Sequence, residues 1–218
     1  MLSYQIQAAG DSRSFPTPHA LHAAADAKGS GLIITGCDAG AVFSQCKDFA
    51  ARSFVAIELG TECLGVHTGE SRGKEGSNVL GFARYRLGDA EPTELVELVR
   101  QPGTSADALA AARAAFESAG MVVAVCYDFP GRIVDRLIRP YFNAALRRLD
   151  EKLATADDLD KTLCLGLGYP EGPITLLERT GLVHHHDVSA ALHAALGQES
   201  YSPARRAQVA KQRVERAT

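Results

Sequence analysis

The sequence predicts an α/β domain over residues 1–127 followed by an all-α domain over residues 128–218. In the first part, short apolar runs bounded by glycine alternate with alanine-rich stretches of helical spacing. From Asp128 onward, after the turn sequence DFPG, only helical patterns occur. Because strands that alternate with helices form mainly parallel sheets, we expect a parallel sheet covered by helices, followed by a helical domain.

Four apolar runs are predicted strands, and three stretches between them are predicted helices. The strands cover 2–10, 31–36, 54–60 and 121–127, and the helices cover 18–29, 41–51 and 105–120. The third helix is the best defined, because Thr104 and Asp107 have the spacing of a capping box and Gly120 is suited to end it.

The second part begins with a wide apolar stripe of 3.6-residue spacing, which predicts a helix over 133–153. Pro140 lies inside this stripe and is expected to kink the helix. Ser202 and Pro203 indicate a helix start, as cap and first helical residue. The other predicted helices run from 155 to a glycine-rich turn at 166–173, over 173–180, over 187–196, and over 202–217.

Composition excludes several classes of function. The chain is 46% hydrophobic and 22% charged with a net charge of −3, so a nucleic-acid or anionic-membrane surface is not expected. The N-terminal residues lack the features of a secretory signal, and apolar runs are too short to span a bilayer, so we expect a cytoplasmic protein. Five cysteines without a CxxC pair predict neither a disulfide framework nor a zinc site.

The second part resembles the C-terminal domain of the 3-hydroxyacyl-CoA dehydrogenase family. The strings DFPGRIVDRLIRPY and GLGYPEGP match family motifs written D-x-P-G-F-[IV]-[VI]-N-R-L-x-x-P-Y and G-x-G-[YFH]-P-x-G-P. The matching residues are Pro130, Gly131, Arg136, Pro140, Tyr141, Asp158, Asp160, Gly166, Gly168, Pro170, Gly172, Pro173, Gly181 and Leu182. The resemblance implies a reduced Rossmann-like sheet followed by a helical domain like the C-terminal domain of 6-phosphogluconate dehydrogenase.

Weaker resemblance continues upstream, through residues 60–66, 78–86 and 94–109. It implies oxidation of the 3-hydroxyl of an acyl-CoA by NAD, with a histidine base, a glutamate that orients it, and a serine and an asparagine that hold the substrate oxygen. The glutamate falls on Glu97, and the asparagine falls on Asp135. The histidine falls on Ala83 and the serine on Glu62, which we assign as substrate-binding positions, whereas we assign Glu97 and Asp135 as catalytic. Three of the four positions therefore carry a different residue.

The cofactor motif of a dinucleotide fold is also missing. Such a fold needs G-x-G-x-x-G at its first strand–helix turn, where backbone N–H groups hold the pyrophosphate. Gly29 and Gly31 precede a predicted strand instead of following one, and Gly36 and Gly40 do not complete the motif. We therefore assign no cofactor-binding residue, and expect NAD only if the family activity is retained.

Two clusters allow more than one interpretation. In the family fold, three acids would converge: Glu97, Asp135 and Glu62. They could form a rebuilt acid–base site or a cation site. We favour the other interpretation, in which they are drifted residues neutralised by Arg84, Arg86 or Arg132. Histidines 184–186 precede a predicted helix capped by Asp187, which favours a surface loop over a metal site. No metal ligands are assigned, and His19 and His22 are expected on an ordinary helix face.

The resemblance and the departures together predict a 3-hydroxyacyl-CoA dehydrogenase-like protein that has lost hydride transfer. Such a protein would bind an acyl-CoA-like ligand or a partner, as a homodimer through its C-terminal helices. The alternative is an active NAD-dependent oxidoreductase on a 3-hydroxyacyl-CoA in fatty-acid or aromatic degradation. A further alternative is that another chain completes the N-terminal sheet.

Overall fold

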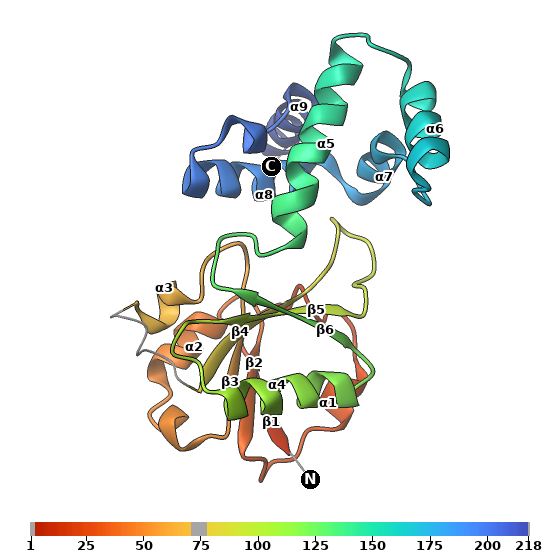
Figure 1. The fold of residues 1–218 in the computed structure, drawn as a ribbon. Coiled ribbons are helices and arrows are strands. Elements are labelled where there is room, and N and C mark those ends of the chain that lie inside the picture. Colours follow the sequence, from red (N-terminus) through yellow and green to blue (C-terminus); the bar gives the residue numbers. More distant parts are fainter. Residues whose placement is uncertain (1–2, 71–77, 218) are drawn as a thin grey trace. The chain divides into compact units, whose positions relative to one another are not determined.

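The computed structural model describes residues 3–70 and 78–217, which divide into two compact units (Figure 1). The first unit comprises Met1–Arg86 and Pro92–Ile133, and the second comprises Leu87–Glu91 and Val134–Thr218. The short segment 87–91 is tied to the second unit by a hydrogen bond from the Asp89 backbone N–H to the carbonyl of Thr180. Each unit is described by itself below.

The first unit contains a six-stranded sheet in the order β1-β2-β3-β4-β5-β6. Neighbouring strands are parallel except β4 and β5, which are antiparallel. The strands are β1 Tyr4–Ala8, β2 Gly31–Thr35, β3 Val55–Glu58, β4 Val79–Arg84, β5 Leu95–Arg100 and β6 Val122–Tyr127. The predicted mainly parallel sheet is confirmed, and it contains all four predicted strands. β4 and β5 are additional and correspond to the stretches recognised only by family resemblance.

Helices cover both faces of this sheet. On one face α4 (Ala106–Ser118) buries its alanines and Phe116 against side chains that include Phe54, Leu80 and Phe82. On the other face α2 (Ala39–Gln45) contributes Phe43 to a second apolar cluster. The remaining helices of this unit are short: α1 Ala20–Ala23, the 3₁₀ turn η1 Phe49–Ala51 and α3 Gly65–Thr68. The sheet is therefore the middle of three layers.

Several local predictions differ from the structure in the first unit. The helix expected over 18–29 is reduced to α1, whose first turn is capped by the His19 Nδ1 atom. The predicted capping box at Thr104 does not form, because its hydroxyl accepts a hydrogen bond from the N–H of Gln101, and Ser105 becomes the N-cap. Gly120 follows α4 with φ +87°, as its predicted role as a helix stop requires.

The second unit is helical, as predicted. Its elements are α5 Val134–Asp150, α6 Ala156–Leu167, α7 Pro173–Thr180, α8 Leu182–Leu196, η2 Glu199–Tyr201 and α9 Arg205–Glu215. Pro140 lies inside α5, which continues past it. The last helix starts after Ala204, so Ser202 and Pro203 precede it instead of opening it. Buried side chains such as Phe142, Leu146 and Leu192 form the interior of this unit.

None of the helices in the described part of the chain combines the length and the apolar character needed to cross a membrane.

Candidate functional site

Ala83, the position that the resemblance assigns to a histidine, faces Glu97 on the neighbouring strand. Ala83 on β4 and Glu97 on β5 are direct partners in the antiparallel register. Side chains of directly opposed residues lie on the same face of a sheet, typically about 5 Å apart at Cβ. The structure therefore brings these two predicted site residues together. However, Ala83 presents only a buried methyl group, which cannot accept or donate a proton.

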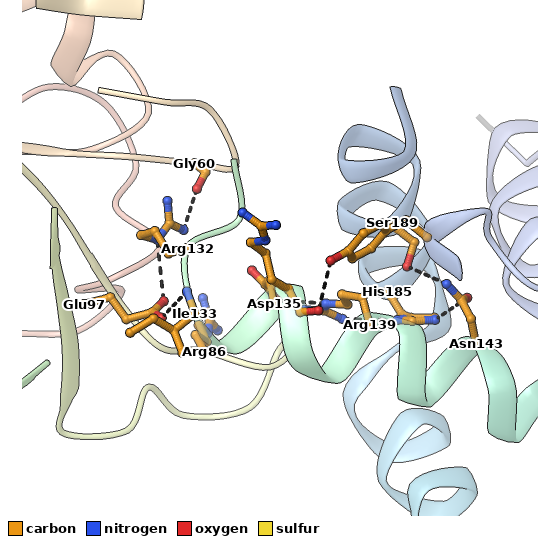
Figure 2. Close-up of polar contacts among 12 residues, drawn as sticks. Gly60, Arg86, Glu97, Arg132, Ile133, Asp135, Arg139, Asn143, His185 and Ser189 are labelled. Carbon is orange, nitrogen blue, oxygen red and sulfur yellow. Dashed lines mark hydrogen bonds and ion pairs between the residues drawn. The ribbon is translucent and has the colours of Figure 1, made fainter. Parts of the chain in front are cut away.

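Glu97 is buried, with 4% of its surface exposed, and its carboxylate interacts with the segment that follows β6 (Figure 2). One oxygen accepts a hydrogen bond of 2.8 Å from the backbone N–H of Ile133. The other lies 3.5 Å from Nε of Arg132, close enough for an ion pair. A cation thus stands beside the glutamate. Of the three arginines expected to neutralise the acids, Arg132 does so for Glu97, whereas Arg84 pairs with Glu94.

Arg132 is itself enclosed, with 7% of its surface exposed. Its Nη2 atom donates a hydrogen bond of 2.6 Å to the carbonyl of Gly60. Its Nε and Nη1 atoms are buried and make no hydrogen bond to any described residue, and Nε contacts Glu97 only as an ion-pair partner at 3.5 Å. Glu97 is therefore the main charge compensation for this guanidinium.

The loop after β3 holds the backbone that carries Arg132. The carboxylate of Asp128 accepts hydrogen bonds of 2.7 and 2.8 Å from the N–H groups of Leu64 and Gly65. The N–H of Gly131 also donates to the carbonyl of Thr61. These bonds fix a tight turn in which Arg132 adopts φ +51°, an uncommon value for a residue other than glycine. The turn directs the arginine towards Glu97, and its strain is offset by this network.

Glu62 has different partners from Glu97. Its carboxylate accepts a 3.0 Å hydrogen bond from the N–H of Gly60 and lies 3.5 Å from Nε2 of His67. Asp135, the fourth predicted site residue, belongs to the second unit, where it forms a 2.8 Å ion pair with Arg139. In the described residues, no group of three or more His, Cys, Asp or Glu side chains is arranged to hold a metal ion.

Two cysteines near this part of the first unit are poorly suited to act as nucleophiles. Burial is the main cause that raises the pKa of Cys63 to about 11, and Asp128 adds to it. The pKa of Cys126 is also raised to about 11, by burial and then by the charge of Glu97. Both therefore remain protonated thiols at neutral pH. Cys126 is only partly buried, because β6 is an edge strand.

The histidine run contradicts the prediction of a surface loop. Histidines 184–186 lie inside α8, and His185 is fully buried. Its Nδ1 lies 3.3 Å from Nη1 of Arg139, and its Nε2 lies 3.0 Å from Oδ1 of Asn143 (Figure 2). Since arginine can only donate, Nδ1 accepts and Nε2 carries the proton that is donated to Asn143. Burial, followed by the charge of Arg139, lowers the pKa of His185 to about 3.

The spacing of polar residues, not of apolar ones, was the sequence feature that could have indicated this hydrogen-bond network. Asp135, Arg139 and Asn143 are spaced by four along α5, and His185 and Ser189 are spaced by four along α8. Residues four apart share a helix face. Asn143 completes the network by accepting from the N–H of Ala204 and donating to the carbonyl of Ser200. These polar side chains connect α5, α8 and the start of α9.

The carboxyl ends of β1, β2 and β3 are the place where a parallel α/β sheet binds a dinucleotide. Here the buried carboxylate of Glu58, the last residue of β3, already occupies the N–H donors of the neighbouring loops. It accepts hydrogen bonds of 2.6 Å from the N–H of Gly36, 2.8 Å from the N–H of Ser14 and 2.7 Å from the hydroxyl of Ser12. A phosphate group would meet a negative charge instead of free donors.

The loops after β1 and β2 are also joined to one another. The N–H of Cys37 donates to the carbonyl of Asp11, and the N–H of Asp38 donates to that of Ala9. Gly36, at φ +111°, allows this approach, because a Cβ there would lie 2.1 Å from the Ala9 carbonyl oxygen. The strand order in the described chain runs without the reversal that opens a binding crevice. The loops after β1 and β2 therefore do not fit NAD bound in the usual mode.

The glycine positions were partly predicted. Gly29 precedes β2 and Gly31 is its first residue, so neither follows a strand, and a Cβ on either would collide with Tyr4 or Phe54. Sequence analysis missed Gly10, which follows β1 with φ +78° and stands where a dinucleotide-binding loop has its first glycine. It is followed by Asp11 and Ser12 instead of the other glycines of the motif.

Comparison with known proteins identifies the lineage. Residues 131–218 match the family model of the 3-hydroxyacyl-CoA dehydrogenase C-terminal domain. The C-terminal part of the chain therefore belongs to the 3-hydroxyacyl-CoA dehydrogenase C-terminal domain family. Among its relatives in this family is a probable 3-hydroxybutyryl-CoA dehydrogenase of Deinococcus radiodurans, 32% identical over 110 residues, which are 50% of this chain and 40% of that protein. The mitochondrial hydroxyacyl-coenzyme A dehydrogenase of Sus scrofa is 39% identical over 89 residues, 41% of this chain and 28% of that protein.

Solved structures of the 3-hydroxyacyl-CoA dehydrogenase family confirm the predicted fold class. The (S)-3-hydroxybutyryl-CoA dehydrogenase of Ralstonia eutropha has a TM-score of 0.68 at 20% identity, covering 87% of this chain and 66% of that one. The 3-hydroxybutyryl-CoA dehydrogenase of Escherichia coli has a TM-score of 0.70 at 23% identity, covering 89% and 40%. The matched residues thus span 40% or less of the length of the two curated relatives named above.

Proposed function

We propose that this protein is a family member without hydride-transfer activity, and that it binds an acyl-CoA-like ligand as a homodimer. The observation that carries the proposal is the pairing of Ala83 with Glu97, whose carboxylate is engaged by Arg132. A histidine that acts as general base increases the reaction rate by about 10²–10⁴-fold. Neither alanine nor arginine can accept the proton in its place at neutral pH.

The cofactor loops support the same proposal. The Glu58 carboxylate occupies the N–H groups of Gly36 and Ser14, and the loops after β1 and β2 are hydrogen-bonded together. NAD binding would have to displace a buried charge that already has three donors. We therefore expect neither the cofactor nor the base that the family reaction needs.

A turnover assay tests this proposal directly. Purified protein is mixed with acetoacetyl-CoA and NADH, and with 3-hydroxybutyryl-CoA and NAD, while an active 3-hydroxybutyryl-CoA dehydrogenase is run in parallel. The absorbance of NADH should not change above background. Turnover that follows enzyme concentration would establish the alternative, an active NAD-dependent oxidoreductase, for which the retained Glu97 is the supporting observation.

The variant Ala83→His separates the two causes of inactivity. It restores a histidine opposite Glu97 but leaves the cofactor loops closed, so we expect it to remain inactive. Activity in this variant would show that the missing base alone is responsible and that the cofactor site is intact. Calorimetry with acetoacetyl-CoA and with NAD then measures each ligand separately. Binding of the acyl-CoA alone is the expected result, and binding of neither ligand would favour a partner protein.

The proposed dimer is supported by apolar side chains on the second unit. Leu165 and Leu167, at the end of α6, are 82% and 61% exposed, and Leu153 before α6 is also exposed. Phe142 and Leu146 of the α5 stripe are buried within the unit and cannot serve an interface. Light scattering after size exclusion should show a dimer, and Leu165→Glu should shift it to monomer. Val209→Glu on α9 is the matched control, because Val209 is a less exposed apolar residue on another helix.

A further inference from the structure

A pocket lies at the carboxyl ends of β1 and β2, within the first unit. Its volume is about 460 Å³, which lies in the range of about 300–1,000 Å³ that is usual for small-molecule sites. The last residues of the two strands, Ala8 and Thr35, line it together with part of the loop that follows β1. Ala83, Glu97 and Arg132 are not part of this lining, so the pocket is separate from the family's reaction centre.

The hydroxyl of Thr35 is a buried polar group at this pocket. Thr35 is the direct partner of Ala8 in the β1–β2 register, so the two side chains lie on the same face of the sheet. Thr35 is only 2% exposed, and its hydroxyl makes no hydrogen bond to any described residue. Because a buried hydroxyl without a partner is unfavourable, this one indicates a ligand group that completes its hydrogen bonding.

Asp11 provides a second open acceptor. It lines the pocket and is exposed, and its carboxylate forms no hydrogen bond or ion pair within the described chain. An ionised carboxylate can only accept hydrogen bonds, and its two oxygens can accept from two neighbouring hydroxyl groups at once. The pocket therefore offers acceptors that a ligand with several hydroxyl groups would satisfy.

The charges at the pocket cancel one another. Arg13 and Arg86 line it, and both are engaged within the protein, since Nη2 of Arg13 donates to the Arg86 carbonyl. Asp11 lines it as an anion, and Glu58 is bonded to Ser12, another residue of the lining. Two cations and two anions leave no net charge for a ligand to match. The pocket therefore favours an uncharged ligand.

One wall of the pocket is aromatic. The rings of Phe15 and His22 both line it and meet edge to face, with their centres 5.3 Å apart. Burial, followed by the charge of His19, lowers the pKa of His22, so its ring is uncharged at neutral pH and can donate or accept one hydrogen bond. The face of an aromatic ring carries partial negative charge. Such a face suits the C–H groups on one side of a sugar or cyclic polyol ring.

We infer that this pocket binds a small uncharged polyol, such as a monosaccharide or a cyclic polyol. Its neighbouring hydroxyl groups bind Asp11 and Thr35, and its C–H face packs against Phe15. A nucleotide does not meet these conditions, because its phosphate groups would add negative charge next to Asp11 and Glu58. This ligand is also distinct from the acyl-CoA of the proposed function, and the two are tested with different compounds.

Titrations with four compounds test the ligand class. Glucose, myo-inositol, glucose 6-phosphate and cyclohexanol are each added to the full chain and followed by ligand-observed NMR. Glucose or myo-inositol should bind saturably, at least tenfold more tightly than cyclohexanol, which has a single hydroxyl group. Glucose 6-phosphate should bind no more tightly than glucose. Binding of neither polyol, equal binding of cyclohexanol, or a tenfold gain from the phosphate group would overturn the inference.

Two buried threonines test whether the pocket is the site. Thr35→Val keeps the shape of the side chain but removes the hydroxyl, so binding of the better polyol should weaken at least fivefold. The thermal unfolding midpoint should not fall, because no hydrogen bond within the protein is lost. Thr104→Val is the matched control, since the Thr104 hydroxyl accepts from the N–H of Gln101. This control should lower the midpoint and leave polyol binding unchanged.

Asp11→Asn provides a second, exposed variant at the same pocket. It should weaken polyol binding at least tenfold, whereas Asp107→Asn, at an exposed position in the first turn of α4, should not. Equal effects of the two threonine variants on binding, or unchanged binding in Asp11→Asn, would show that the polyol binds elsewhere and contradict the inference. Titration with acetoacetyl-CoA tests the proposed function and has no bearing on these results.

Discussion

Ala83 and Glu97 lie directly opposite one another in the β4–β5 pair, and the charge next to Glu97 is the guanidinium of Arg132. The family motif has phenylalanine at the position of Arg132 and histidine at that of Ala83. The two departures are therefore linked in space. One removes the titratable partner of the glutamate, and the other supplies a permanent cation that keeps the buried carboxylate compensated.

The Glu97–Arg132 pair should contribute strongly to stability. Breaking a buried ion pair by removing one partner costs roughly 3–5 kcal/mol, since the remaining charge stays buried. We expect Glu97→Gln and Arg132→Met each to lower the free energy of unfolding by that amount, as measured in urea. The double variant should be more stable than the sum of the two losses predicts.

An exposed pair provides the comparison for that prediction. Arg113 and Glu117 form an ion pair on the surface of α4, with 53% and 42% of their side chains exposed. Arg113→Met should change stability by no more than about 1 kcal/mol, because exposed pairs contribute little. Similar losses for Arg113→Met and Arg132→Met would show that Glu97 and Arg132 are not coupled as described.

His185 should make the second unit sensitive to acid. Its pKa is lowered from 6.5 to about 3 in the folded protein, so the unfolded chain binds a proton more readily between these values. The stabilisation is complete above about pH 6.5 and is lost as the pH falls towards 3. With about 1.4 kcal/mol for each pKa unit, the loss amounts to roughly 3–5 kcal/mol.

Urea unfolding across this pH range measures the effect. His185→Gln should be less stable than the parent near neutral pH but should lose less stability on acidification, because the variant has no buried imidazole to protonate. His193→Gln, in the same helix but outside the buried network, should keep the acid sensitivity of the parent. If both variants respond to acid as the parent does, other groups cause the acid sensitivity.

The fold class could be predicted because it follows from the spacing of apolar residues along the chain, which does not depend on long-range contacts. The details that failed depend on long-range partners. The helix expected at 18–29 shrinks to four residues, and residues 26–29 instead form a turn in which the N–H of Asp26 donates to the carbonyl of Tyr4 on β1. His184–His186 appear as a polar run, yet His185 is buried by pairing with Arg139 and Asn143, 46 and 42 residues away.

The candidate site was predictable to a similar extent. Resemblance placed Ala83 and Glu97 together, and the register confirms that they face each other. It could not predict that Arg132 would be the cation, because Arg84 and Arg86 are nearer to Glu97 in the sequence than Arg132 is. The role of Glu58 was not foreseen, since its three donors come from loops 22 to 46 residues away.

Glu58 gives the sharpest test of the closed cofactor loops. Its carboxylate accepts three hydrogen bonds, and bonds to a charged group contribute about 1.5–3 kcal/mol each. Glu58→Gln replaces one acceptor oxygen by an NH₂ group that faces a backbone N–H or a hydroxyl. We expect it to destabilise the first unit by roughly 2–4 kcal/mol. The amides of Gly36 and Ser14 should exchange with solvent deuterium faster than in the parent.

Glu62→Gln is the matched control, because Glu62 is less buried and accepts a backbone hydrogen bond only from its own turn. Its effect on stability should be no more than about 1 kcal/mol, with exchange at Gly36 unchanged. If Glu58→Gln leaves the exchange of both amides unaltered, the carboxylate does not hold these loops. The N–H groups at the ends of β1 and β2 would then be available to an anion, and the argument against dinucleotide binding would lose its main support.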